Sequence, residues 1–144
     1  MPTPFESAQL ILALYEQRRE DTMRKARDYF TSFDPTTYEE FMAGIMGPQS
    51  GYIRMVMSYW DMAASLVNNG AIDQQMFVDA TGEFILVFAR IEPFLPQLRE
   101  AFGNPNFAQH LEKLALGIPN GRERVDGTLK RMRAMLATRA AATR

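Results

Sequence analysis

The sequence predicts an all-α fold without a sheet, arranged as a five- or six-helix bundle or an orthogonal helical array. Apolar residues recur every three or four positions along most of the 144 residues, which is the period of amphipathic helices. No stretch alternates apolar and polar residues as a half-buried strand does. Proline, glycine and asparagine separate the periodic stretches, which indicates helices joined by short connections.

The first helix is predicted to begin after Thr3, which forms a capping box with Glu6, and to run to about Thr31. Plotted as one continuous helix, it has a single main apolar face that we expect in the core. That face comprises Phe5, Ala8, Ile11, Leu12, Tyr15, Met23, Ala26, Tyr29, Phe30 and Phe33.

Two leucines of this helix, Leu10 and Leu14, lie off its main apolar face. Their cover is either the last helix of the chain or a second copy of the molecule, whose two-fold pairing would also bury the stems of Gln17 and Arg18. These four residues are the candidate interface, and a homodimer is one prediction that follows from them.

The second helix follows Asp34-Pro35, with Thr36 and Glu39 as its capping pair, and ends at Gly47-Pro48. The third, about Gln49 to Asn69, is apolar over more than half of its circumference and is therefore placed at the centre of the fold. Its few polar residues form one narrow stripe, which either faces water or lines a groove or polar interface. The candidate polar stripe consists of Arg54, Ser58, Asp61, Ser65 and Asn68.

The fourth helix is predicted to begin after Asp73 as N-cap and to be kinked or restarted at Pro93 and Pro96. Phe84 lies on its wide apolar arc, as Trp60 lies on that of the third helix, and we expect both residues in the core. Asp79 and Glu83 lie with Arg90 in a thin polar stripe opposite the aromatic face. The expectation for that stripe is exposure to water.

The fifth helix is predicted to open at Asn104-Pro105 and to close at Gly117. The last, residues 121–144, carries one apolar stripe and an excess of positive charge, with seven basic and two acidic side chains against nine basic and fifteen acidic in residues 1–120. Its basic arm either packs on the acidic body or contacts nucleic acid or an anionic surface. The candidate arm residues are Arg124, Lys130, Arg131 and Arg133.

Length and composition predict one folded domain spanning residues 1–144. The chain is 47% hydrophobic and 23% charged, as ordinary globular domains are. No apolar run is long enough to span a bilayer, and the N-terminus has no secretory signal pattern, so a cytoplasmic location is expected.

Catalytic side chains are scarce. The chain has no cysteine and a single histidine, His110, at the edge of an apolar helix face, where a structural role is expected. The Glu-x-x-His pair of di-metal bundles is absent because Phe107 precedes His110 by three positions, and no glycine-rich phosphate loop occurs. We therefore predict neither a metal, nor a cofactor, nor enzymatic activity.

Residues 59–73, YWDMAASLVNNGAID, followed by the aromatic segment Phe84 to Phe88, resemble a group of small helical bacterial domains of unknown function. The shared pattern is a helix of aromatic and small residues that ends in a Gly-x-Ile-Asp turn. Members of that group often carry an N-terminal membrane anchor, which we do not expect from the residues of this sequence. The resemblance implies a helical fold and assigns neither an activity nor functional residues.

Three functions remain open from the sequence. The first is a non-catalytic interaction module that self-associates or binds a protein partner. The second is a binder of a small apolar ligand between the central helices, whose methionines are adaptable in shape. The third is weak contact of the basic arm with nucleic acid or an anionic surface, although the arm has no aromatic residues for base stacking.

Overall fold

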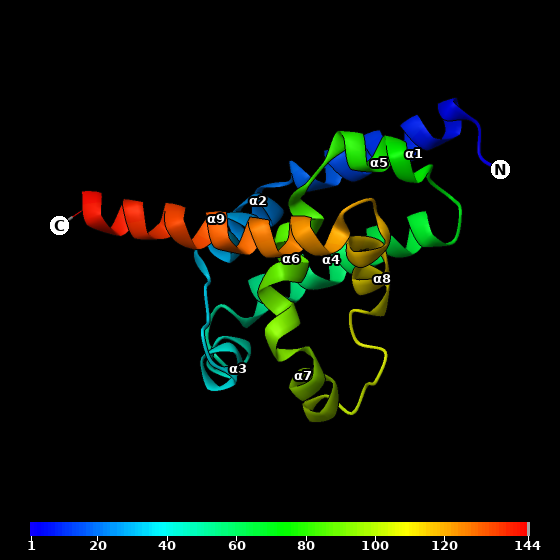
Figure 1. The fold of residues 1–144 in the computed structure, drawn as a ribbon. Helices are drawn as coiled ribbons and strands as arrows, with labels where there is room; N and C mark the ends of the chain where they lie inside the picture. The colour runs from blue at the N-terminus through cyan, green and yellow to red at the C-terminus, as the bar shows by residue number, and fades with distance from the viewer. Residues whose placement is uncertain (144) are drawn as a thin grey trace.

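A computed structural model describes residues 1–143, and over these residues the chain is all-α, as predicted, without a strand (Figure 1). It has more helices than the five or six expected, because the first predicted helix is broken in two and the fourth in three. The helices are α1 (Pro4–Arg18), α2 (Asp21–Ser32), α3 (Tyr38–Met46), α4 (Ser50–Asn68), α5 (Gln74–Ala80), α6 (Glu83–Ile91), α7 (Leu95–Ala101), α8 (Gln109–Gly117) and α9 (Gly121–Ala142), with a 3-10 turn, η1 (Glu92–Phe94), before α7.

Helix α4 is the centre of the fold, as its wide apolar circumference predicts. It packs against α2, α3, α5, α6 and α8, and its buried residues include Ile53, Trp60 and Val67. One continuous core connects residues from α1 to α9, with Trp60 and Phe84 both fully buried in it. The expectation that these two aromatic residues are core residues is therefore confirmed.

The break between α1 and α2 corrects the prediction of one helix running to Thr31. Glu20 leaves the helical conformation with an extended ψ of 140°, and its carboxylate accepts hydrogen bonds from the backbone N–H groups of Thr22 and Met23. These bonds satisfy two free donors in the first turn of α2. They also hold the pKa of Glu20 below its usual range, because they favour the ionised carboxylate.

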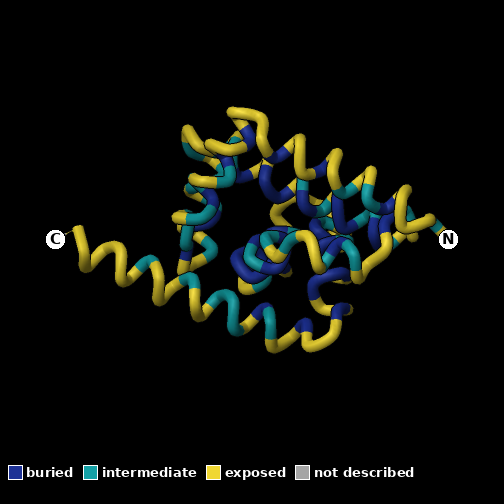
Figure 2. Tube along the Cα trace, turned by 90° about the horizontal axis from the view of Figure 1, so that it is seen from above, coloured by how far each residue is buried: buried dark blue, intermediate teal, exposed yellow. Residues whose placement is uncertain are grey.

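Helix α9 begins against the end of α8. A side-chain Cβ at Gly121 would lie 2.4 Å from the carbonyl oxygen of Ala115, so only glycine allows this approach. The first half of α9 packs on α6 and α8 through Val125, which is buried, and Leu129, which is partly buried. Its second half projects beyond the other helices toward the C-terminus (Figure 1) and is mostly exposed (Figure 2).

Within residues 1–143, no helix combines the length and the apolar character that crossing a membrane requires.

Candidate functional site

The polar stripe of α4 is not simply a face left to water. The Oδ1 atom of Asp61 accepts a hydrogen bond of 2.9 Å from the backbone N–H of Leu111, in the first turn of α8. The Nδ2 atom of Asn68 donates to the carbonyl oxygen of His110 at 2.9 Å. Ala108, at the N-cap position of α8, provides no side-chain cap. The C-terminal part of the stripe, from Asp61 to Asn68, therefore fixes α8 on α4.

The N-terminal part of the stripe, Arg54 and Ser58, is more accessible to solvent. Arg54 is exposed, and its Nε donates to Ser50 Oγ at 3.1 Å. Its guanidinium forms no ion pair with residues 1–143. Ser58 donates its hydroxyl to the carbonyl oxygen of Met55. Ser65, which lies between Asp61 and Asn68 in the stripe, accepts from the side chain of Asn69. Arg54 thus remains as a positive charge without an anionic partner in the described chain.

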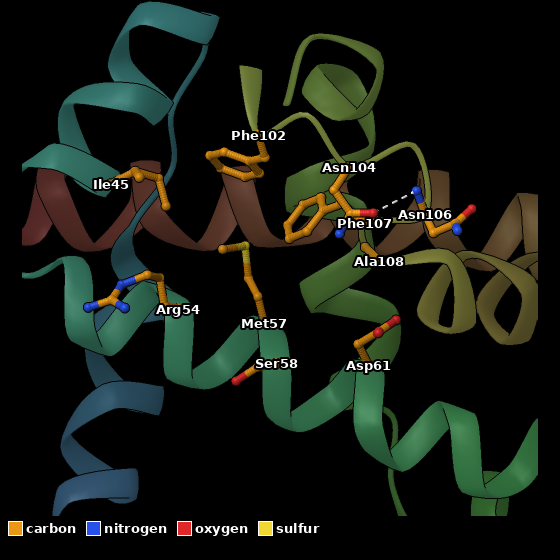
Figure 3. A pocket seen from close by; sticks show the side chains of 10 residues that line it. All are labelled: Ile45, Arg54, Met57, Ser58, Asp61, Phe102, Asn104, Asn106, Phe107 and Ala108. Atoms are coloured by element: carbon orange, nitrogen blue, oxygen red, sulfur yellow. Dashed lines mark hydrogen bonds between the residues drawn. The ribbon is translucent and has the colours of Figure 1, made fainter. Parts of the chain in front are cut away.

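Three stripe residues line a pocket of about 380 Å³ between α3, α4 and the segment that joins α7 to α8 (Figure 3). We call it the α4 pocket. Its volume lies in the range of small-molecule sites. It is lined by Ile45, Arg54, Met57, Ser58, Asp61, Phe102, Asn104, Asn106, Phe107 and Ala108.

The segment 102–108 forms the wall opposite α4. The rings of Phe102 and Phe107 pack edge to face, with centroids 5.2 Å apart. The side chain of Asn104 accepts a hydrogen bond from the backbone N–H of Asn106, which tightens the turn. Ala108 closes the segment with a φ of 57°, in the left-handed region that L-residues other than glycine, asparagine and aspartate rarely adopt.

Sequence reasoning missed this wall. Asn104-Pro105 reads as the start of a helix, whereas α8 begins only at Gln109. Arg99 holds the intervening segment in place, because its Nε donates to the carbonyl oxygen of Phe107 and its Nη2 contacts Glu112 at 3.0 Å. The sequence contains no local signal for these contacts.

Helix α1 presents an apolar face to solvent, and it is not the predicted one. Phe5, Leu12 and Tyr15, expected in the core, are 71%, 65% and 51% exposed. Ala8 lies between them and is partly buried. We call these four residues the α1 face. The prediction treated α1 and α2 as one continuous helix with one apolar face. Because the chain breaks at Glu20, the residues of α1 that face the core are not those that continue the apolar face of α2.

The candidate interface of Leu10, Leu14, Gln17 and Arg18 is wrong for two of its four residues. Leu14 and Arg18 are buried inside the chain, while Leu10 and Gln17 are exposed. The carbonyl oxygen of Leu14 accepts a hydrogen bond from Tyr59 Oη, and the guanidinium of Arg18 lies 5.1 Å from the Trp60 ring centroid. Leu14 and Arg18 therefore attach α1 to α4 instead of facing a partner.

The small side chain of Ser7 attaches the other end of α1. It is fully buried, and its Oγ accepts a hydrogen bond of 3.0 Å from the backbone N–H of Asp73, beside α5. Burial of Tyr59 against α1 raises the pKa of its phenol. Ser7 and Arg18 thus face inward on α1 together with Leu14, whereas Phe5, Leu12 and Tyr15 lie outside.

The basic arm is partly used within the chain. Arg133 contacts Asp34 at 3.3 Å, which links the projecting part of α9 to the segment after α2. Arg122 contacts both Glu92 and Asp126, and these two carboxylates raise the pKa of its guanidinium. Arg124, Lys130 and Arg131 form no ion pair with other residues of 1–143. The arm therefore does pack on the acidic body at two points.

Asp79, Glu83 and Arg90 were expected to face water from one stripe of the fourth predicted helix. This expectation is wrong for Glu83 and Arg90. Glu83 binds Arg27, with its Oε2 at 2.9 Å from Arg27 Nε, and accepts a hydrogen bond of 2.8 Å from Trp60 Nε1. This carboxylate raises the pKa of Arg27. Asp79 alone is exposed.

Arg90 is the second exception, because it is almost fully buried. It donates hydrogen bonds to the carbonyl oxygens of Thr31 and Phe33 at the end of α2, and it lies 3.8 Å from Asp34. Burial lowers the pKa of Arg90. Its Nε has no hydrogen-bond partner among the described residues.

No group of three or more histidine, aspartate or glutamate side chains in residues 1–143 is placed to hold a metal ion. His110 is partly buried, and its backbone oxygen, rather than its ring, makes the contact with Asn68.

Comparison with known proteins gives one match. The model of a family described as "Domain of unknown function (DUF4760)" matches residues 4–118, which end just before α9. No curated protein and no solved structure matches this chain.

Proposed function

Because this chain belongs to the DUF4760 family of domains of unknown function, we propose its function from its own surface: it is a non-catalytic interaction module that pairs with a second copy through α1. The observation that carries the proposal is the exposed α1 face. A large apolar patch on a soluble domain typically marks a contact surface. Here it comprises three large exposed side chains on one helix, beside the side on which Ser7, Leu14 and Arg18 attach that helix to the core.

The spacing of the α1 face supports helix pairing. Phe5, Ala8, Leu12 and Tyr15 are separated by three, four and three positions, which is the a-d-a-d spacing of a coiled-coil seam. Two such helices in antiparallel two-fold contact would place Phe5 of one copy beside Tyr15 of the other, and Ala8 beside Leu12. The small alanine lets the opposing leucine approach closely. A two-fold contact of this kind is self-complementary, as dimers require.

Charge supports the antiparallel direction. In that arrangement Glu16 of one copy lies near the first turn of α1 in the other, where the positive end of the helix dipole favours negative charge. The Glu16 carboxylate now contacts Arg19, the residue that follows α1, at 3.3 Å, and both side chains are largely exposed. A cytoplasmic location and a bacterial origin are part of the same proposal and rest on the sequence.

Sedimentation of wild type and variants tests the proposal. Wild-type protein should be dimeric at high micromolar concentration. Leu12→Glu should weaken the dimer roughly 100-fold, because it places a carboxylate without a partner against Ala8 of the other copy, inside the apolar contact. The variant should keep its helical circular dichroism and its unfolding midpoint, since Leu12 contributes little to the core.

Leu116→Glu is the matched control, at an exposed leucine on α8. It should leave the dimer intact. A wild-type protein that stays monomeric overturns the proposal, and so does equal dissociation by the Leu116 variant.

A further inference from the structure

The α4 pocket combines an apolar interior with a cation at one end. Met57 is buried at the base of the pocket, and the Phe102–Phe107 pair forms the facing wall. Although the Phe102 ring packs on Phe107, Phe102 remains 39% exposed. A hydrocarbon or aromatic group in the pocket would cover this exposed surface, which is favourable in proportion to the apolar area buried.

The polar groups of the pocket differ in how far they are already used. Asp61 is bound to α8 through Leu111, and Ser58 and Asn104 have hydrogen bonds within the chain. Arg54 has only the contact of its Nε with Ser50, so its terminal nitrogens are free to donate. Among the lining residues, Arg54 is the single basic side chain.

The two charges of the pocket lie at opposite ends. Arg54 and Asp61 are seven positions apart on α4, which is about 10 Å along a helix. Figure 3 shows Arg54 below Ile45, at the α3 end, and Asp61 on the side of Ala108. An anionic group at Arg54 is therefore remote from the carboxylate of Asp61, and the apolar surface lies between them.

From this arrangement we infer that the α4 pocket binds a small amphipathic carboxylate, with its apolar body between Met57, Phe102 and Phe107 and its carboxylate on Arg54. An arginine fork matches a carboxylate in geometry and forms charge-assisted hydrogen bonds with it. The cavity of about 380 Å³ accommodates a chain of medium length or a single aromatic ring. The inference does not depend on pairing through α1.

Three probes of equal chain length test the charge requirement: octanoate, octan-1-ol and octylammonium. Each is titrated below its micelle concentration and followed by chemical shifts of backbone amides. Octanoate should bind tightest and octylammonium weakest, with the largest shifts at Met57, Phe102 and Phe107. Shifts confined to α1 would mean nonspecific contact with the exposed apolar face and would overturn the inference.

Arg54→Gln tests the role of the guanidinium. It should weaken octanoate binding roughly tenfold and leave octan-1-ol unchanged, because only the charged head group loses its partner. Arg24→Gln, at an exposed arginine of α2 outside the pocket, is the matched control and should bind octanoate as wild type does. Both variants replace an exposed charged side chain by a neutral one, so both should unfold at the wild-type denaturant concentration.

Ser58→Phe tests the location, because a ring on this exposed position of α4 fills the pocket from its floor. It should abolish binding of octanoate and octan-1-ol alike. Octanoate that binds the Arg54 or Ser58 variant as tightly as wild type overturns the inference. Absence of octanoate binding to the wild-type chain at millimolar concentration does so too.

Discussion

Trp60 connects the apolar core to a polar network shared by α1, α2, α4 and α6. Its ring is fully buried, packs edge to face on Tyr59 with centroids 5.0 Å apart, and lies under the guanidinium of Arg18. Its Nε1 donates to Glu83, which also holds Arg27. One side chain therefore combines core packing with the hydrogen bond that orients a half-buried carboxylate.

Removal of this ring should be costly. Trp60→Ala should lower the free energy of unfolding by about 3 to 5 kcal/mol, because it leaves a large cavity, and Phe84→Ala should cost a similar amount. Trp60→Phe should cost less, since it keeps most of the packing and loses mainly the hydrogen bond to Glu83. Urea denaturation measures these differences.

Phe5→Ala is the control for aromatic truncation at an exposed site, and it should change the free energy of unfolding by less than about 0.5 kcal/mol in the monomer. A loss below about 1 kcal/mol for Trp60→Ala would contradict the buried position of this helix face.

At the scale of the elements, the helices that were predicted well have clear signals at both ends. Helix α4 differs from its prediction by one residue at each end, because Gly47-Pro48 precedes it and Asn69-Gly70 follows it. Gly70 adopts the left-handed φ of 81° that a helix C-terminus favours. Signals of this kind are local, so the sequence contains them.

The break between α1 and α2 had no such signal. Arginine and glutamate are good helix formers, and nothing in the run Arg18 to Asp21 requires a helix to end. The break exists because Glu20 caps α2 while Leu14 and Arg18 attach α1 to α4. Tertiary contacts decide it, and they also decide which face of α1 is exposed.

The cap of α2 should be sensitive to acid. The Glu20 carboxylate has a lowered pKa in the folded chain, so it contributes stability above the ordinary glutamate pKa of about 4.3 and loses that contribution as pH falls through the lowered folded value. Glu20→Gln should therefore be less stable than wild type at neutral pH, and the difference should shrink in acid. Denaturation at a series of pH values measures this. A difference that stays constant down to about pH 3 contradicts the capping role.

At the scale of the whole molecule, α9 has two halves with different roles. The first half covers α6 and α8, and the second projects beyond the body. A chain ending at Asn120 should lose at least about 3 kcal/mol of stability, because Val125 and Leu129 no longer cover apolar surface. A chain ending at Arg133 should lose less than about 0.5 kcal/mol, since it keeps both residues and the contact with Asp34.

Urea denaturation of the two truncated chains measures the contrast. Equal stability of both chains would show that α9 is an appendage along its entire length.

The α4 pocket illustrates how much of a site a sequence contains. Arg54, Ser58 and Asp61 could be grouped in advance, because helical periodicity places them on one stripe. The facing wall, residues 102–108, could not, since its position depends on Arg99 and on the turn that returns the chain to α4. Periodicity predicts which residues share a face, and only tertiary structure determines what lies opposite that face.

Helix α8 obtains its N-terminal cap from Asp61, 50 positions earlier in the chain. Its own N-cap residue, Ala108, contributes no side-chain acceptor. We therefore expect the first turn of α8 to be completed only when α8 has docked on α4. In the native protein, exchange of the Leu111 amide hydrogen with solvent requires α4 and α8 to separate. The exchange rate at this single amide thus reports the opening of an interface rather than the fraying of a helix end.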